Sequence, residues 1–225
     1  HMMTGSGVLD SEYFGKVTRK LGEIAERISE ELDIDFEFID IGGGLGVPYR
    51  PEEQEIDVEE VAENVAEALE HFDFDAEVMM EPGRFMVAQS GTLIARVQSV
   101  LEKKDKTYVG LDSGMHHFLR PMLYDAYHEI EAVNPEDEEI CADIVGLVCE
   151  NTDTFAEDRK ISKVESGDLV AVKDVGAYGF AMASNWNTRP KPPEIMIESG
   201  ESKVIREGQE WSDVFHGTGF EEDEL

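Results

Sequence analysis

The residues best suited to bind an anion are three consecutive glycines, Gly42, Gly43 and Gly44, at the end of the apolar run FEFIDI. Glycine has no Cβ, so its backbone amide can approach a ligand closely. Successive N–H groups without side-chain cover form a concavity that binds anions, phosphate above all. The glycine run therefore predicts a site for the phosphate of a cofactor.

A second candidate site is the segment EPGR, from Glu81 to Arg84, which also follows an apolar run. The planar guanidinium of Arg84 suits a phosphate or a carboxylate. The carboxylate of Glu81 could pair with a protonated heterocyclic nitrogen. An ordinary ion pair between Glu81 and Arg84 at a turn is the structural alternative, and it stays open on these residues alone.

The histidines do not predict a metal site. His116 and His117 are adjacent, and neighbouring side chains on a strand or turn point apart. His128 and Glu129 fit the entry to a strand better than an acid–base pair. We therefore expect no metal in this chain.

Hydrophobic periodicity indicates which elements position the two candidate sites. The pattern predicts helices over residues 10–32 and 58–71, a strand over 36–41 and a buried strand over 77–80. Asp10 is the expected N-cap of the first helix, and Asp57 and Glu60 have capping-box spacing in the second. This alternation is typical of a parallel α/β sheet or barrel, where ligands bind at the carboxyl ends of the strands.

The pattern changes beyond about residue 90, and a domain boundary is expected near residues 89–91. No long helical pattern follows, so we predict a β-rich second domain. A short helix over 209–215 and an acidic tail end the chain. The predicted strands cover residues 92–100, 108–112, 130–133, 144–149, 169–175 and 194–198.

The charge of the chain limits its partners. With 51 acidic and 19 basic residues the net charge is −32, which argues against nucleic acid or an anionic membrane. Acidic residues spread along the chain fit a protein kept soluble in high salt, and an acidic protein from ordinary salt is the alternative. Cys141 and Cys149 could span a disulfide, but so few cysteines and no signal peptide or long apolar stretch indicate a cytoplasmic protein.

Five ordered segments resemble the diaminopimelate decarboxylases, which belong to the alanine-racemase-like, pyridoxal-phosphate-dependent decarboxylases. The resemblance extends from residue 1 to about 215. The glycine run and EPGR are shared with ornithine and arginine decarboxylases, whereas RPMLY, the CEN segment and GAYGFAMASNWN are typical of the diaminopimelate branch. The segments are DIGGGLGVPY, EPGRFMVAQSG, DSGMHHFLRPMLYDAYHEI, GLVCENTD and DVGAYGFAMASNWNTRPKPPEI.

This resemblance implies a fold of two parts. Residues 1–90 would form the last β/α units of a (β/α)8 (TIM) barrel, so the α/β barrel is partial in this chain. Residues 91–225 would form a β-rich domain of the sandwich or Greek-key kind. Only two or three of eight barrel units are present, so we interpret the chain as the C-terminal portion of a longer enzyme or one piece of a split one.

The resemblance also assigns roles to residues. Ser6, Gly42, Gly43 and Gly44 would bind the phosphate of pyridoxal 5'-phosphate, with Arg84 close by and also near the substrate. Glu81 would keep the pyridine nitrogen protonated. The remaining assigned residues are Arg120, which would bind the distal carboxylate, Tyr124 and Glu150 at the substrate, Tyr178 against both cofactor and substrate, and Cys149 as proton donor.

In the family, the residues that match Cys149 and Glu150 are contributed by the other subunit across a homodimer interface. Each assignment has a structural alternative. Cys149 could be a small buried apolar residue, and Tyr124 and Tyr178 could be packing aromatics.

Three departures from the family pattern stand out. No lysine matches the one through which the family attaches its cofactor, since Lys16 and Lys20 lie on the predicted first helix and the other candidates form a charged turn. Met3 replaces a histidine of the family's HxGS segment. Asn151 replaces the serine of Cys-Glu-Ser.

We expect the complete protein to decarboxylate meso-2,6-diaminopimelate to L-lysine. The alternatives are decarboxylation of another basic amino acid or a carboxylated polyamine, or a non-catalytic chain that dimerises or pairs with a separate lysine-bearing chain. Arg120 favours the first, because a distal carboxylate requires a cation whereas a distal ammonium requires an acid.

Overall fold

The structure is a computed structural model that describes residues 1–72 and 76–219. The chain divides into two compact units, residues 1–91 and 92–225. The break lies where the sequence changes from helical to strand patterns. The acidic tail predicted from the sequence lies outside the described residues.

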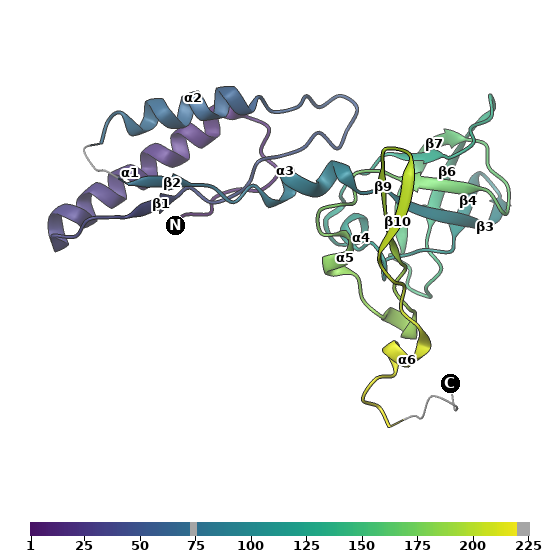
Figure 1. The fold of residues 1–225 in the computed structure, drawn as a ribbon. Helices are drawn as coiled ribbons and strands as arrows, with labels where there is room; N and C mark the ends of the chain where they lie inside the picture. The colour runs from purple at the N-terminus through teal and green to yellow at the C-terminus, as the bar shows by residue number, and fades with distance from the viewer. Residues whose placement is uncertain (73–75, 220–225) are drawn as a thin grey trace. The chain divides into compact units, whose positions relative to one another are not determined.

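The first unit contains two helices that lie side by side, α1 (Ser11–Leu32) and α2 (Val58–Leu69) (Figure 1). Asp10 caps α1 as predicted, because its side chain accepts the Glu12 N–H. Asp57 caps α2 by accepting the N–H groups of Glu59 and Glu60. Both helix starts follow from local chemistry that the sequence displays.

The sheet of the first unit has two short parallel strands among the described residues, β1 (Phe38–Asp40) and β2 (Glu77–Met79). The prediction of a buried strand at the second position is wrong, since Glu77 and Met79 are exposed. A two-stranded sheet with helices on one face leaves alternate side chains uncovered. The strand is followed by α3 (Gly83–Val87) and a 3-10 helix, η1 (Ala88–Ser90).

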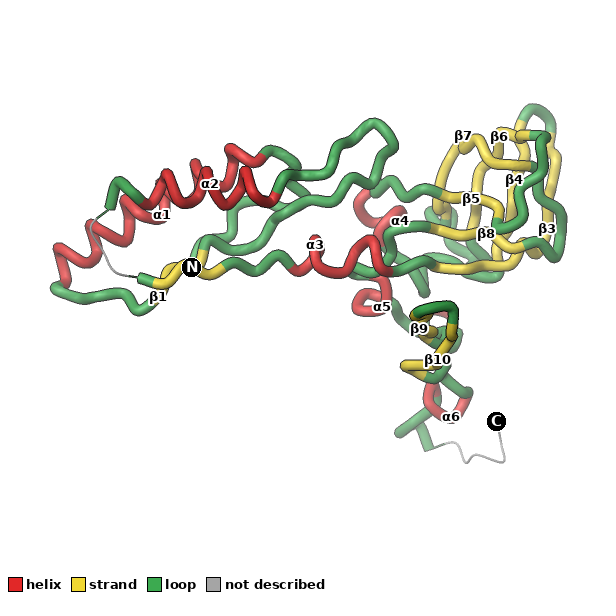
Figure 2. Tube along the Cα trace, turned by 45° about the horizontal axis from the view of Figure 1, so that its top comes forward, coloured by secondary structure: helices red, strands yellow, loops and turns green. Residues whose placement is uncertain are grey.

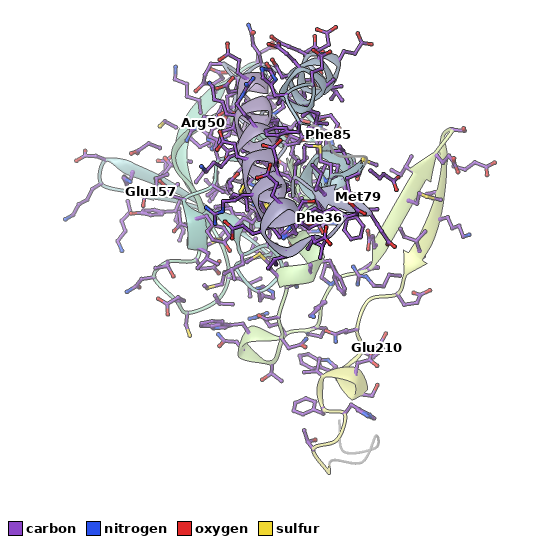
Figure 3. All side chains as sticks on the ribbon, turned by 90° about the vertical axis from the view of Figure 1, so that its left-hand side faces the viewer. Phe36, Arg50, Met79, Phe85, Glu157 and Glu210 are labelled. Carbon is purple, nitrogen blue, oxygen red and sulfur yellow. The ribbon has the colours of Figure 1, made fainter. Side chains whose placement is uncertain are left out.

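Two apolar clusters hold this unit together. One is built on Phe14, Leu45, Ile56 and Val61, and the other on Leu21, Ala25, Ile39 and Ile41. Phe85 packs against the first cluster and Phe36 against the second, and both are labelled in Figure 3. The clusters lock the strand before the glycine run against α1, which fixes the place of the glycines.

The second unit is built on one six-stranded sheet in the order β5-β8-β3-β4-β6-β7 (Figure 2). The β4–β6 pair is parallel and the other pairs are antiparallel. The two edge strands approach each other, so that the sheet curls towards a closed barrel. The strands are β3 (Leu93–Lys103), β4 (Lys106–Leu111), β5 (Ile130–Ala132), β6 (Glu139–Val145), β7 (Thr154–Ser162) and β8 (Leu169–Val172).

The core of this unit is a single cluster in which Val97, Val109, Ile144, Val170 and Val172 are almost completely buried. The outer elements are a hairpin and short helices. They are α4 (Arg120–Tyr124), α5 (Gly179–Met182), the 3-10 helix η2 (Trp186–Thr188), the antiparallel strands β9 (Glu194–Glu198) and β10 (Glu201–Arg206), and α6 (Trp211–Val214).

The strands of the second unit differ from the prediction at several places. The strand expected over residues 144–149 is β6, which ends at Val145, so Cys149 lies in a turn. The strands β7 and β10 were not predicted from the sequence. Among the described residues, no helix is both long and apolar enough to cross a membrane.

Candidate functional site

The glycine run Gly42–Gly44 lies where backbone segments approach too closely for any side chain. A Cβ on Gly43 would stand 2.3 Å from the carbonyl oxygen of Glu81, and one on Gly42 would stand 2.4 Å from that of Met2. A Cβ on Gly44 would stand 2.6 Å from the carbonyl oxygen of Gly5. Gly42 and Gly44 also have φ values of +76° and +104°, which favour glycine.

Two of the glycine amides have partners within the chain. The Gly42 N–H donates to Asp40 Oδ1 at 2.8 Å, and the Gly43 N–H donates to Met3 Sδ at 3.3 Å. Met3 therefore lies beside the glycine run, at the place where the resemblance expects a histidine. The run forms a narrow backbone cradle in which Gly44 is the residue next to Ser6, whose amide nitrogen would be 3.8 Å from the added Cβ.

Arg84 is bonded to the residues around this cradle. Its Nη2 donates to Ser6 Oγ and its Nη1 donates to the Tyr49 hydroxyl, both at 3.1 Å. The guanidinium carbon also lies 5.7 Å from the centre of the Tyr49 ring. The structure thus brings together Ser6, Arg84 and the glycine run, as predicted. Sequence reasoning missed Tyr49, whose only signal is an aromatic residue five positions after the last of the three glycines.

Glu81 is bonded to His1, whose Nε2 lies 3.0 Å from Glu81 Oε2 at an exposed position. The predicted alternative, an ion pair between Glu81 and Arg84, is not the arrangement found, because Arg84 is bonded to Ser6 and Tyr49. His1, Asp40 and Glu81 place one ligand atom each within 4.8 Å of one another. Exposed acidic groups commonly cluster without an ion, so this group by itself indicates no metal.

The described residues around Gly42–Gly44 fit a cofactor that carries a phosphate. The backbone packs so closely at the glycine run that no side chain fits there, and a hydroxyl, a phenol and a guanidinium are bonded to one another beside it. These are the donors that bind phosphate oxygens in proteins. The only two lysines in the sequence of this unit, Lys16 and Lys20, form ion pairs with Glu12 and Glu23 on the surface of α1.

In the second unit, Arg120 is buried at the start of α4, with 6% of its surface exposed. Its Nη1 lies 2.7 Å from Nε2 of His128, which is 1% exposed. Nδ1 of His128 lies 2.8 Å from the carbonyl oxygen of Lys173. The expectation that His128 only begins a strand is incomplete, because it also holds Arg120.

The two candidate tyrosines are exposed in this chain, so neither belongs to its buried core. Tyr124 is 62% exposed at the end of α4, and Tyr178 is 46% exposed before α5. Tyr178 has φ +61° and ψ 9°, in the left-handed region that a bulky residue seldom adopts. Strain of this kind is concentrated at functional sites.

Cys149 is also exposed, which contradicts the alternative of a buried apolar residue. Cys141 is free as well, so the possible disulfide between them does not form. The amide Nδ2 of Asn187 donates to Cys149 Sγ at 3.6 Å, and Asn187 itself has φ 54° and ψ 34°. Glu150, the next residue, is exposed.

Asp153 fixes the turn that carries Cys149. Its two carboxylate oxygens accept the N–H groups of Met115 and Val148 at 2.7 Å and 2.9 Å. A Cβ on Gly146 would stand 2.1 Å from Asp153 Oδ2, so the glycine makes room for the carboxylate. Burial raises the pKa of Asp153, which the two backbone bonds partly oppose.

His116 and His117 lie together, with ring centres 3.7 Å apart, so the expectation that they point apart is wrong. His117 is bonded at both nitrogens, to Ser113 Oγ and to the carbonyl oxygen of Pro190, each at 3.1 Å. Burial, together with the charges of His117 and Arg189, lowers the pKa of His116 to about 4. Burial also lowers the pKa of His117. Both rings are therefore neutral at pH 7.

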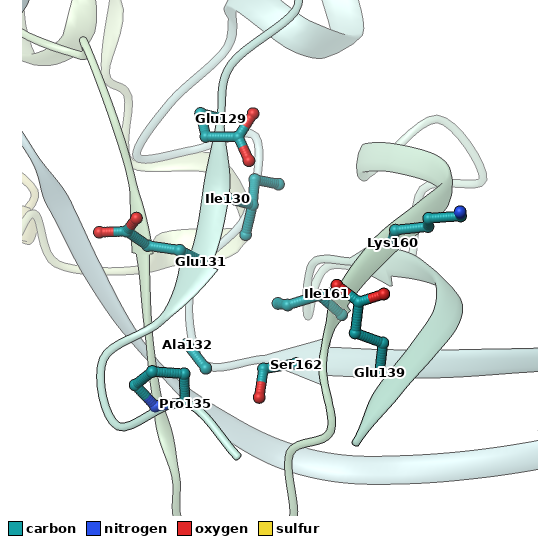
Figure 4. A pocket seen from close by; sticks show the side chains of 9 residues that line it. All are labelled: Glu129, Ile130, Glu131, Ala132, Pro135, Glu139, Lys160, Ile161 and Ser162. Atoms are coloured by element: carbon teal, nitrogen blue, oxygen red, sulfur yellow. The ribbon is translucent and has the colours of Figure 1, made fainter. Parts of the chain in front are cut away.

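A small open pocket of about 250 Å³ lies between β5 and β7 (Figure 4). It is lined by strand residues such as Ile130, Glu131 and Ile161 and contains none of the candidate site residues. The space marks the gap at which the curled sheet stays open, and it lies apart from the predicted chemistry.

Comparisons with known proteins identify the family. The family described as "Pyridoxal-dependent decarboxylase, C-terminal sheet domain" matches residues 10–176. The diaminopimelate decarboxylase of Methanothermobacter thermautotrophicus is 39% identical over 224 residues, which cover 96% of this chain and 52% of that protein.

Solved structures agree with this result. Diaminopimelate decarboxylase from M. jannaschii, in complex with L-lysine, superposes with a TM-score of 0.90 at 32% identity and covers 98% of this chain and 51% of that one. The Helicobacter pylori enzyme, also complexed with L-lysine, has a TM-score of 0.85 at 40% identity and covers 94% and 52%. The chain spans about half the length of the relatives it matches.

Proposed function

The chain belongs to the pyridoxal-dependent decarboxylase family, and we propose that the protein that carries it converts meso-2,6-diaminopimelate to L-lysine and CO2. The names of the similar proteins support this substrate. The single observation that carries the proposal is the phosphate-binding cluster of Ser6, Arg84 and Tyr49 beside the glycine run.

We propose that this cluster holds pyridoxal 5'-phosphate. Ser6 Oγ and the Tyr49 hydroxyl would donate to phosphate oxygens, and the guanidinium of Arg84 would balance their charge. Gly42, Gly43 and Gly44 would let the backbone pack closely beside the phosphate, because any side chain there meets a carbonyl oxygen of a neighbouring segment. The Glu81 carboxylate would keep a proton on the pyridine nitrogen.

Pyridoxal phosphate, when bound, supplies an electron sink for the pair of electrons left when a carboxylate departs as CO2. The C–C bond to that carboxylate breaks, and a C–H bond forms at the same carbon. Cys149 is the proposed donor of this proton, because its thiol is exposed in a turn that Asp153 fixes. Arg120 would bind the distal carboxylate, and Tyr124, Glu150 and Tyr178 would contact the substrate.

A finer description of the fold is part of this proposal. Residues 1–90 would supply the last β/α units of a TIM barrel, and residues 91–225 a sandwich or Greek-key domain. The two-stranded sheet of β1 and β2 favours the first, because such a short sheet gains stability when further strands extend it.

We also propose a homodimer in which Cys149 and Glu150 of one subunit reach the site of the other. The hairpin of β9 and β10 supports this, because Ile197 is 77% exposed and Ile195 and Ile205 are exposed as well. An isolated hairpin is marginally stable in water, so a covering surface would stabilise it. Free thiols at Cys141 and Cys149 suit the cytoplasm, where thiols stay reduced.

The test is a competition assay with the full-length protein and pyridoxal phosphate. Equal concentrations of meso-diaminopimelate, lysine, ornithine and a carboxylated polyamine are supplied together, and the decarboxylated products are measured by mass spectrometry. We expect lysine from diaminopimelate to be the dominant product. Arg120→Ala should reduce that preference about tenfold or more, since a charged hydrogen bond is lost.

Lys163→Ala is the control, because its side chain pairs with Glu138 at a surface position and should leave the preference unchanged. A dominant product from another substrate would contradict the proposal. An unchanged preference in Arg120→Ala would contradict the role assigned to Arg120.

A further inference from the structure

We propose that His128 is a positioning residue: it orients Arg120 without neutralising it and so determines the preference for a substrate with an anionic distal group. This inference rests on the proposed function, because it deepens the substrate role of Arg120. The argument starts from the hydrogen bonds of the imidazole, which lie wholly within the second unit.

The geometry fixes one form of His128. A guanidinium can only donate, so the 2.7 Å contact makes Nε2 of His128 the acceptor from Arg120 Nη1. A carbonyl oxygen can only accept, so the 2.8 Å contact makes Nδ1 the donor to Lys173. The imidazole is therefore neutral, with its hydrogen on Nδ1. A second proton on Nε2 would face the guanidinium at this distance and break the bond.

Several contacts hold the imidazole in place. The ring of Phe118 meets it edge-on, with centres 4.6 Å apart and an interplanar angle of 83°. Arg159 Nη1 donates to the carbonyl oxygen of His128 at 2.7 Å, and the Lys173 N–H donates to the carbonyl oxygen of Glu129 at 2.9 Å. The ring is thus connected to β7 and to the residue that follows β8, and the orientation of Arg120 depends on hydrogen bonds to the sheet of the second unit.

Because His128 is a neutral acceptor, it affects the charge of Arg120 differently from a carboxylate. A carboxylate beside Arg120 would form a charge pair and weaken the attraction of the guanidinium for another anion. Histidine fixes the direction of the side chain and adds no negative charge. A substrate carboxylate would then meet a guanidinium whose histidine partner carries no charge, which supports selection by charge at the distal end.

The same imidazole is also linked to the segment that carries Tyr178, another residue proposed to contact the substrate. The carbonyl oxygen of Lys173 accepts the Nδ1–H of the imidazole, and Lys173 directly follows β8 and precedes the short segment that leads to Tyr178. One ring therefore connects the start of α4 with the base of the segment that carries the strained tyrosine. A change at His128 should affect substrate binding from both sides.

The test compares His128→Gln with His128→Asn in the full-length protein. A glutamine side chain can place an oxygen near the position of Nε2, whereas asparagine reaches only the position of Nδ1. We expect His128→Asn to lower kcat/KM for diaminopimelate about tenfold to a hundredfold, chiefly through KM, and His128→Gln to restore most of it. A substrate with hydrogen in place of the distal carboxyl should be much less affected.

Long-range ¹H–¹⁵N NMR of the unaltered protein gives an independent measurement of the tautomer. Protonated Nδ1 and unprotonated Nε2 at His128 would support the inference, and the reverse tautomer would overturn it. Equal losses for both substrates in His128→Asn would also overturn it, because they would indicate a purely structural role. Absence of diaminopimelate turnover in the unaltered enzyme would instead contradict the proposed function, whatever the tautomer.

Discussion

At the scale of the residue, the site depends on side chains whose roles are set by non-local neighbours. Arg84 is bonded to Ser6 and Tyr49, and neither partner is near it in the sequence. Glycine runs and arginines can be recognised in a sequence because their chemistry is intrinsic. The acceptor role of His128 cannot be recognised in this way, since it depends on Arg120 and Lys173 meeting the same ring.

The buried His116 should make the protein sensitive to acid. The unfolded chain binds a proton near pH 6.5, whereas burial lowers the pKa in the folded protein to about 4. Between these values the unfolded state binds more protons, so stability falls as the pH falls from 6.5 towards 4. This shift in pKa corresponds to on the order of 3 kcal/mol in the free energy of unfolding. The His116→Phe variant has no imidazole to protonate, so this part of the stability loss in acid should disappear.

The measurement is the urea midpoint of unfolding at several pH values between 4 and 7. His71→Asn is the matched control, because this histidine is exposed. This variant should lose stability with falling pH as steeply as the unaltered protein. If His116→Phe loses stability with acid as steeply as the unaltered protein, the burial argument is wrong.

At the scale of the element, helices followed from the sequence better than strands. The starts of α1 and α2 were predicted because Asp10 and Asp57 cap them locally. The strand β7 was missed because the charged run EDRK lies inside it and Asp158 adopts φ +46°, which interrupts the alternation. Asp143 accepts the Asp158 N–H and stabilises this irregularity from the neighbouring strand.

The glycine run gives a prediction at this scale. Gly43→Ala places a Cβ 2.3 Å from the carbonyl oxygen of Glu81, which is backbone and cannot move aside cheaply. We expect a loss of at least about 2 kcal/mol in the free energy of unfolding, or failure to fold. Thermal unfolding followed by circular dichroism measures this effect.

Gly83→Ala is the matched control for this substitution. No heavy atom lies within 4 Å of its added Cβ, and Gly83 begins the helix α3. Alanine there should be neutral or stabilising by about 0.5 kcal/mol. Equal stability of the two variants would show that the close approach at Gly43 does not constrain the fold.

At the scale of the whole molecule, the net charge of −32 should govern how stability responds to salt. Acidic residues repel one another, and chloride salts shorten the Debye length from about 10 Å at 0.1 M to about 3 Å at 1 M. We propose that the protein comes from a salt-rich setting and expect its Tm to rise by several degrees between these concentrations of KCl. A Tm that falls or stays constant would contradict this expectation.

The central claim is that Arg84 and its neighbours hold the phosphate of pyridoxal phosphate. The most direct measurement is the ratio of Kd values for pyridoxal and pyridoxal phosphate, because the two ligands differ only by the phosphate. The full-length protein should prefer the phosphate form strongly, and Arg84→Ala should lose about tenfold or more of that preference. Arg27→Ala, which removes an exposed partner of Glu31 on α1, should retain it. An unchanged ratio in Arg84→Ala would contradict the account.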